Sequence, residues 1–225
     1  MADKHFNKWE IIMRVFRSIF LVALLVLSTS ACSIRHVIEQ DYPQYLVNNT
    51  GAANLPNTDK ASEYFLTSNT QSHSYEFRAV ATGYANLWIV EFGKMLDDSL
   101  QSADVQNAFG ALQKVSDVSD DSRGLLIFDL QSYTFEDFGA HISLKISLSR
   151  LGQVVFSKTY KQDGKTQGGK MFWAGAFGQK NAVQQSTKLA LDEILRQLIS
   201  DLNTMTGERI SSEGEPRIYM PNKAN

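Results

Sequence analysis

The chain has 225 residues, of which 43% are hydrophobic and 20% are charged, and its formal net charge at pH 7 is −2. This composition can supply a buried core, and it offers no basic block of the kind that neutralises the phosphates of a nucleic acid. Cys32 is the only cysteine, which excludes disulfides within the chain and cysteine-rich zinc sites.

Residues 1–31 have the order of a bacterial export signal. Basic residues come first, an apolar run extends from Ile19 to Leu27, and small residues lead to Cys32. The run Thr29-Ser30-Ala31-Cys32 resembles the lipobox of bacterial lipoproteins, in which the cysteine is lipidated and becomes the mature N-terminus. An uncleaved membrane anchor is the first alternative. Crossing a bilayer takes roughly 20 apolar residues, and the run from Ile19 to Leu27 has only nine. A soluble exported form is the second.

The resemblance to lipoprotein signals also implies a location. Ser33 follows the cysteine, and serine at that position is compatible with transfer to the outer membrane. We therefore expect a palmitate-bearing, periplasm-facing lipoprotein whose lipidated Cys32 contacts the bilayer, with the inner membrane as the alternative.

A polar stretch with scattered proline and glycine extends from Cys32 to Ser62. It offers too few apolar residues to compensate for the entropy of ordering, so we expect residues 32–62 to be a flexible tether. About 30 flexible residues would hold the folded part roughly 30 Å from the membrane.

The folded domain is expected over residues 63–206, with its first strands at Tyr64–Leu66 and Tyr75–Val80. After Thr82-Gly83, apolar residues recur at helical spacing from Ile89 to Ala103, which predicts an amphipathic helix. Trp88 beside this stripe is expected in the core.

The clearest sheet signal follows at residues 125–160. Apolar and polar residues alternate from Ile142 to Leu148, a pattern typical of an antiparallel strand with one buried face. Leu151-Gly152-Gln153 predicts the turn into a hairpin partner at Val154–Tyr160. A last amphipathic helix is expected from Asn181, with Lys188, Asp192, Glu193 and Arg196 in solvent, and with Gly207 as its C-cap before a mobile tail at 207–225. The expected fold is α+β, an antiparallel sheet of about four to five strands with two amphipathic helices packed on one face.

Three segments that suggest ligand chemistry are interpreted otherwise. Residues 164–170 follow the glycine and lysine spacing of a phosphate-binding loop, but Met171 replaces the required Ser or Thr, so no nucleotide is expected. The acidic run at 117–121 lacks the glycine and glutamate of a calcium-binding loop, and we expect a solvated turn. His141 has no second ligand at metal spacing, so we expect a surface residue, no metal, no cofactor and no catalytic group.

Three aromatic residues, Phe172, Trp173 and Phe177, stand among four glycines. One interpretation is that they cover the end of the sheet and fill the core. The other is an exposed patch that contacts a partner protein or lipid, because such patches mark interaction sites.

The pattern as a whole resembles known lipoproteins. Asn86-Leu87-Trp88 opening a helix, a strand with Phe135-Glu136, a hairpin around Gly152 and a terminal helix rich in Ala and Leu look like the auxiliary lipoproteins of ABC-type transport systems, the PqiC-like ones included. The segment from His141 to Leu202, with Gly175-Ala176-Phe177, is similar to YajG-like lipoproteins. The resemblance implies a non-enzymatic binding or assembly component of an envelope transport system, with lipid transport as one option and an envelope protein as partner. The alternative is a structural lipoprotein or assembly factor without a small-molecule ligand.

Overall fold

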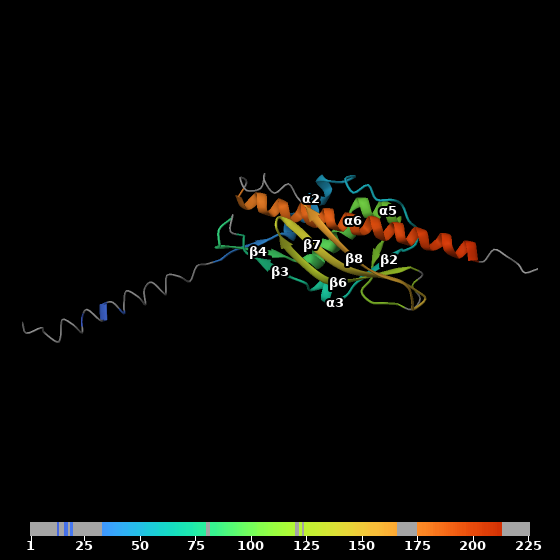
Figure 1. Cartoon of the computed structure of the whole chain (residues 1–225), viewed down its shortest axis with the longest axis horizontal. Helices are drawn as coiled ribbons and strands as arrows, with labels where there is room; N and C mark the ends of the chain where they lie inside the picture. The colour runs from blue at the N-terminus through green and yellow to red at the C-terminus, as the bar shows by residue number, and fades with distance from the viewer. Residues whose placement is uncertain are drawn as a thin grey trace, which may run out of the picture.

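Two β-sheets and a group of helices make up the computed structural model of the chain (Figure 1). The structure describes residues 33–79, 82–119, 122, 124–165 and 175–212, and the single residues 13, 16, 17 and 19. The elements in chain order are β1 (Ile34–Val37), η1 (Glu39–Asp41), α2 (Tyr42–Asn48), β2 (Glu63–Leu66), α3 (Ser68–Gln71), β3 (Tyr75–Phe77), β4 (Asn86–Val90), α4 (Phe92–Gln101), α5 (Ala103–Phe109), β5 (Gln113–Lys114), β6 (Leu125–Glu136), β7 (Gly139–Arg150), β8 (Gln153–Lys165) and α6 (Gly175–Ser212).

The larger sheet has five strands in the order β5-β2-β6-β7-β8. Strands β6, β7 and β8 are antiparallel neighbours, and β2 lies parallel to both β6 and β5. The alternate apolar residues of β7, from Ile142 to Leu148, are buried, which confirms the face predicted from their period of two. Leu151 and Gly152 form the turn into β8 with positive φ at both positions, as a tight hairpin with right-handed twist requires.

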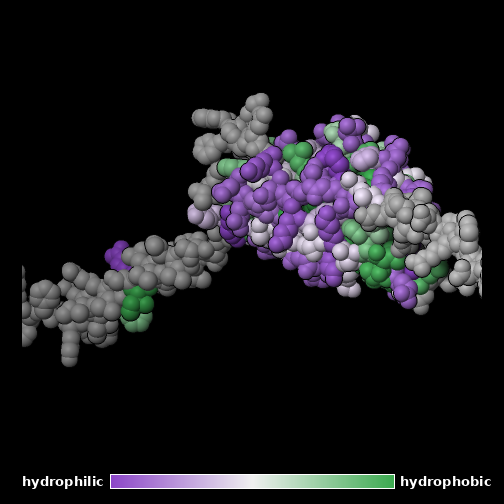
Figure 2. Space-filling view, turned by 45° about the vertical axis from the view of Figure 1, so that its right-hand side comes forward, coloured by the Kyte–Doolittle hydropathy of each residue, from purple (hydrophilic) through white to green (hydrophobic). Residues whose placement is uncertain are grey.

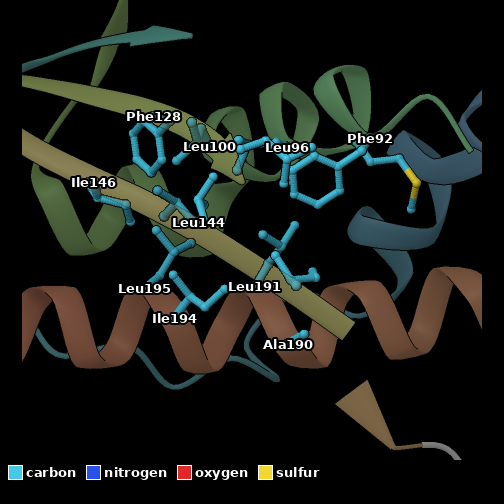
Figure 3. Packing of buried hydrophobic residues seen from close by; sticks show 14 of the residues in the cluster. Phe92, Leu96, Leu100, Phe128, Leu144, Ile146, Ala190, Leu191, Ile194 and Leu195 are labelled. Carbon is cyan, nitrogen blue, oxygen red and sulfur yellow. The ribbon is translucent and has the colours of Figure 1, made fainter. Parts of the chain in front are cut away.

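Helices α4 and α6 cover the same face of this sheet. Tyr133 of β6 contacts both of them: its ring centroid lies 5.1 Å from that of Phe92 on α4, and its hydroxyl lies 3.0 Å from the Thr187 hydroxyl on α6. Figure 3 shows apolar side chains of α4, the sheet and α6 pointing toward one another in one core. The α+β class with two helices on one face is therefore confirmed.

Helix α6 is longer than its sequence pattern predicts. It runs for 38 residues from Gly175, so Asn181 lies within it and is not its N-cap. Gly207 also lies inside the helix, and the prediction of a tail from 207 is wrong as far as Ser212. A glycine in a helix costs only about 1 kcal/mol relative to alanine, which a long packed helix tolerates. Residues 213–225 lie outside the described part of the chain.

A second, smaller sheet was not expected. Its order is β1-β4-β3, with β1 parallel and β3 antiparallel to β4. Residues Asn86–Val90 were predicted to open a helix, but they form β4, and α4 begins only at Phe92. The reason is that Trp88, Ile89 and Val90 are consecutive and all buried, which suits a strand covered on both faces.

The prediction of a flexible tether over residues 32–62 is wrong for the described residues from Ser33 onward. β1 pairs with β4, and Ile38 and Tyr42 are fully buried. The Tyr42 hydroxyl lies 3.1 Å from the Ser99 hydroxyl of α4, and the Gln184 side chain of α6 donates to the Ile38 carbonyl at 3.0 Å. A few apolar residues suffice here because each one enters a core built by later segments, and that long-range pairing leaves no local periodicity.

Candidate binding surface and pocket

Only one of the predicted site residues falls within the described part of the chain. Cys32, Phe172 and Trp173 lie outside it. Phe177, in the first turn of α6, is 84% exposed, so the interpretation in which it fills the core is wrong for this residue. Among the described residues, no helix is long and apolar enough to cross a membrane.

Exposed apolar residues occur at two ends of the molecule. Figure 2 shows a face that is mostly hydrophilic, with hydrophobic residues gathered at its right-hand end. Leu151 and Val154, at the turn between β7 and β8, are 67% and 63% exposed. Ile34 at the start of β1 and Tyr84 just before β4 are 56% and 68% exposed. Both ends therefore present surfaces on which another molecule can bury apolar area.

A pocket of about 260 Å³ opens where α2, α4, α5 and α6 meet. One wall is apolar and the other is polar, and the two together are formed by Pro43, Leu46, Val47, Thr50, Asp98, Gln101, Ser102, Ala103, Asp104 and Lys188. The segment that was predicted to be a tether supplies the apolar wall through α2. The pocket therefore exists only because residues 42–50 pack against the later helices.

The carboxylate of Asp98 is the unusual group of this pocket. Burial is the main cause that raises its pKa to about 6, and the neighbouring charge of Asp97 raises it further, while Lys114 and Lys94 act in the opposite direction. Within the described part of the chain, no donor forms a hydrogen bond to it. Asp98 can therefore accept a hydrogen bond from a ligand or face a cationic group. Its sequence pattern, an acidic residue on the polar side of a helix, gave no hint of this.

Lys188 and Asp192 form an ion pair beside the pocket, at a distance of 2.6 Å. Both were predicted to be in solvent, but their side chains are only 8% and 14% exposed. Burial raises the pKa of Asp192, and the hydrogen bond from Lys188 opposes this shift. The prediction failed because α2 and α5 cover a part of α6 that looks polar in the sequence.

The other polar groups of the pocket are committed to local structure. The Asp104 carboxylate accepts the backbone N–H of Gly51 at 2.6 Å and so holds the loop after α2. The hydroxyls of Thr50 and Ser102 donate to the backbone carbonyls of Val47 and Ser99. Both hydroxyl protons are therefore used within the fold, at the end of α2 and between α4 and α5.

Each histidine in the described part of the chain contacts other side chains of the fold. His36 stacks on Trp88 with ring centroids 4.4 Å apart. His73 lies edge-on to Phe92, and burial lowers its pKa. His141 is on the surface, as predicted, and lies 2.7 Å from Asp163 across the β7–β8 pair. Among the residues that the structure describes, no cluster of three or more His, Cys, Asp or Glu could hold a metal ion.

Two carboxyl groups, one of them buried, lie next to each other beside the small sheet, and no pattern in the sequence predicts them. Glu39 of η1 is 8% exposed and interacts with Glu91, the residue before α4, and Lys94 forms ion pairs with both. Burial, followed by the hydrogen bond with Glu91, raises the pKa of Glu39 to about 7. Glu39 comes from the supposed tether, so nothing in the sequence placed it near Glu91.

Comparisons with known proteins give little beyond this geometry. No protein-family model matches the chain, and no curated protein does. Among solved structures, the chain is similar to the crystal structure of protein XCC0632 from Xanthomonas campestris, of the family DUF330. The identity is 18%, the TM-score is 0.43, and the match covers 70% of this chain and 91% of the other.

Proposed function

We propose that the protein is a lipoprotein anchored through Cys32 in the outer membrane, where it faces the periplasm. In this proposal it is not an enzyme, and it acts as a binding or assembly component of an envelope transport system with lipids as the candidate cargo. The export signal and the lipobox-like run before Cys32 support the anchor.

The exposure of Phe177 is the observation that carries the binding role. A phenylalanine ring that is 84% exposed on a helix with a fully buried opposite face contributes nothing to the core. Large aromatic side chains that bury at an interface are common anchors of protein–protein contacts. In the sequence, Phe172 and Trp173 precede it by a few residues, which adds apolar area to the same stretch of chain.

Photo-crosslinking in cells tests this role. A photoreactive amino acid is placed at position 177, and in a matched control at Gln185, which is exposed two turns further along α6. We expect a transporter or envelope-assembly subunit to crosslink at 177 and not at 185. Equal products at both positions, or none at 177, would favour the structural lipoprotein without a specific partner.

A second measurement tests the anchor. The Cys32→Ser variant should leave the membrane fraction and no longer incorporate radiolabelled palmitate, while the domain stays folded. If this variant remains in the membrane pellet with its signal uncleaved, the anchor is the apolar segment and the lipid assignment is wrong.

A further inference from the structure

The folded domain begins immediately after the residue proposed to carry the lipid. The Ile34 N–H already donates to the Ala85 carbonyl at 2.8 Å, and β1 continues from there along β4. Consecutive Cα atoms are 3.8 Å apart, so the Cα of Cys32 lies within about 8 Å of that of Ile34. A lipid on Cys32 would therefore leave no room for the tether of about 30 Å that the sequence suggests.

The strand directions fix which end of the molecule this is. β3 runs beside β6 in the same direction, because the Tyr75 ring lies 5.6 Å from that of Tyr133 and the Phe77 ring lies 5.2 Å from that of Phe135. Both strands therefore head toward the turn between β6 and β7. β4 is antiparallel to β3 and therefore starts at this end, and β1 is parallel to β4 and starts there too. We call this the β1 end. Figure 1 shows the chain entering the domain here.

The start of α6 lies at the same end. The Ser186 hydroxyl oxygen accepts the Ala140 backbone N–H at 2.6 Å, near the beginning of β7. Asp201 instead accepts hydrogen bonds from Lys158 and Tyr160, which lie on β8 nearer the turn between β7 and β8. Phe177 precedes Ser186 by nine residues, or about 13 Å of helix, and so extends beyond the beginning of β7. The turn with Leu151 is at the opposite end, because the 12 residues of β7 span roughly 40 Å.

The exposed side chains of the β1 end suit the interface between bilayer and water. Ile34 and Tyr84 are more than half exposed although they flank the same backbone hydrogen bond. Tyrosine is enriched at membrane interfaces because its ring is apolar and its hydroxyl stays hydrated. The charges nearby have both signs, since Arg35 forms an ion pair with Glu76 at 3.9 Å. Zwitterionic headgroups therefore match this end better than strongly anionic ones.

We infer that the β1 end of the domain faces the bilayer, with Ile34 and Tyr84 in the headgroup region of a zwitterionic membrane. This inference rests on the proposed lipid anchor at Cys32. The same orientation turns Phe177 toward the membrane, where a membrane-embedded partner would meet it, and turns Leu151 toward the periplasm.

Site-specific fluorescence on the lipidated protein tests the orientation. Cys32 is the only cysteine, so in the lipidated protein a single added cysteine is the only free thiol. Tyr84→Cys is labelled with an environment-sensitive fluorophore, and Leu151→Cys is the matched control, since both side chains are about two-thirds exposed. The proteins are reconstituted in phosphatidylethanolamine/phosphatidylcholine vesicles, with and without a nitroxide-headgroup lipid.

We expect a blue-shifted emission at position 84 that loses most of its intensity with the nitroxide lipid, and no change at position 151. Two outcomes would overturn the inference in distinguishable ways. If the protein floats with the vesicles but the two labels behave alike, or position 151 is the quenched one, the anchor stands and the orientation is wrong. If the protein does not float with the vesicles, the lipid anchor itself is wrong and the orientation falls with it.

Discussion

The two sheets of this protein differ in what holds them together. The strands β6, β7 and β8 of the larger sheet have 12 or 13 residues each, and the apolar faces of β6 and β7 are buried under α4 and α6. The strands of the smaller sheet have three to five residues. Individual side-chain contacts add to its short backbone ladders: His36 stacks on Trp88 and lies 2.8 Å from the Asn86 side-chain oxygen, and Trp88 donates to the Thr82 hydroxyl.

The sheet that provides most of the stability is therefore a different part of the molecule from the one expected to contact another molecule. The larger sheet has the repeated, locally consistent pattern that makes a fold robust. Beside the smaller sheet, the buried Glu39 lies next to Glu91, and Ile34 and Tyr84 are exposed, so none of these side chains adds apolar area to the core. Elements that depart from folding-optimal chemistry are those most expected to meet another molecule. Here Ile34 and Tyr84 lie where β1 and β4 start, whereas Glu39 and Glu91 follow the ends of these two strands.

The largest effect is expected where the N-terminal segment enters the core. The Tyr42→Ala variant removes a fully buried ring and leaves the Ser99 hydroxyl without its side-chain partner. We expect the free energy of unfolding to fall by about 3–5 kcal/mol, as for other buried aromatic residues. Chemical denaturation measures this. The control is Val47→Ala, which is 66% exposed on the same helix and should be neutral. If the two variants were equally stable, the ring of Tyr42 would not be part of the core, and the prediction of a flexible tether would stand.

The next effect tests how tightly α6 packs on the larger sheet. A Cβ at Gly164 would lie 1.7 Å from the Ser186 backbone carbonyl oxygen, so Gly164→Ala must push α6 away from β8. We expect a loss of about 1–3 kcal/mol. The control Thr159→Ala changes an exposed residue of the same strand. Thermal unfolding that is unaffected by Gly164→Ala would show that the helix is not fixed on this strand.

The carboxyl pair next to the smaller sheet predicts a dependence of stability on pH. The pKa of Glu39 is about 7 in the folded protein and 4.5 in its unperturbed state, so the native state binds the proton more tightly. The stabilisation is complete below about pH 4.5 and is lost as the pH rises through 7. Glu39→Gln keeps a neutral side chain and should be more stable than the wild type at pH 8, by about 1 kcal/mol after screening is allowed for.

Two denaturation series, one for each protein from pH 5 to pH 8, measure this effect. The two stabilities should approach each other as the pH falls from 8 to 5. A difference that is constant over the whole range would mean that Glu39 does not titrate there. Glu91, whose pKa is lowered mainly by the hydrogen bond from Lys94, must remain in both proteins, because it accepts a hydrogen bond from protonated Glu39 in the wild type and can accept one from the amide in Glu39→Gln.

The contrast between the sheets also explains what the sequence could predict. The alternation along β7 and the apolar stripe of α6 are local signals, because each element buries one face under a neighbour. β4 was mistaken for the start of a helix because Ile89 lies four residues before Gly93 and three before Phe92, so a short buried strand continues the spacing of the helix that follows. A run of three or four apolar residues cannot be assigned by periodicity.

The candidate binding site brings together residues that are far apart in the sequence, so no local sequence pattern predicts it. Glu39 meets Glu91, and α2 meets α5 and α6, across 50 residues or more. The exposure of Phe177 had a local signal, an aromatic residue among glycines, but that signal fits a core and a surface equally well. Only the packing of the helix decides between the two.

The smallest effect is expected on the solvent side of the larger sheet. His141 and Asp163 face each other across β7 and β8 at 2.7 Å, but their side chains are 42% and 56% exposed. Exposed ion pairs contribute little because water screens them, so Asp163→Asn should change the free energy of unfolding by less than about 1 kcal/mol. The neighbouring Lys161→Ala variant, also exposed on β8, serves as the control in the same denaturation assay. A loss above about 2 kcal/mol for Asp163→Asn alone would mean that polar contacts also hold the larger sheet, and the contrast with the smaller sheet would fail.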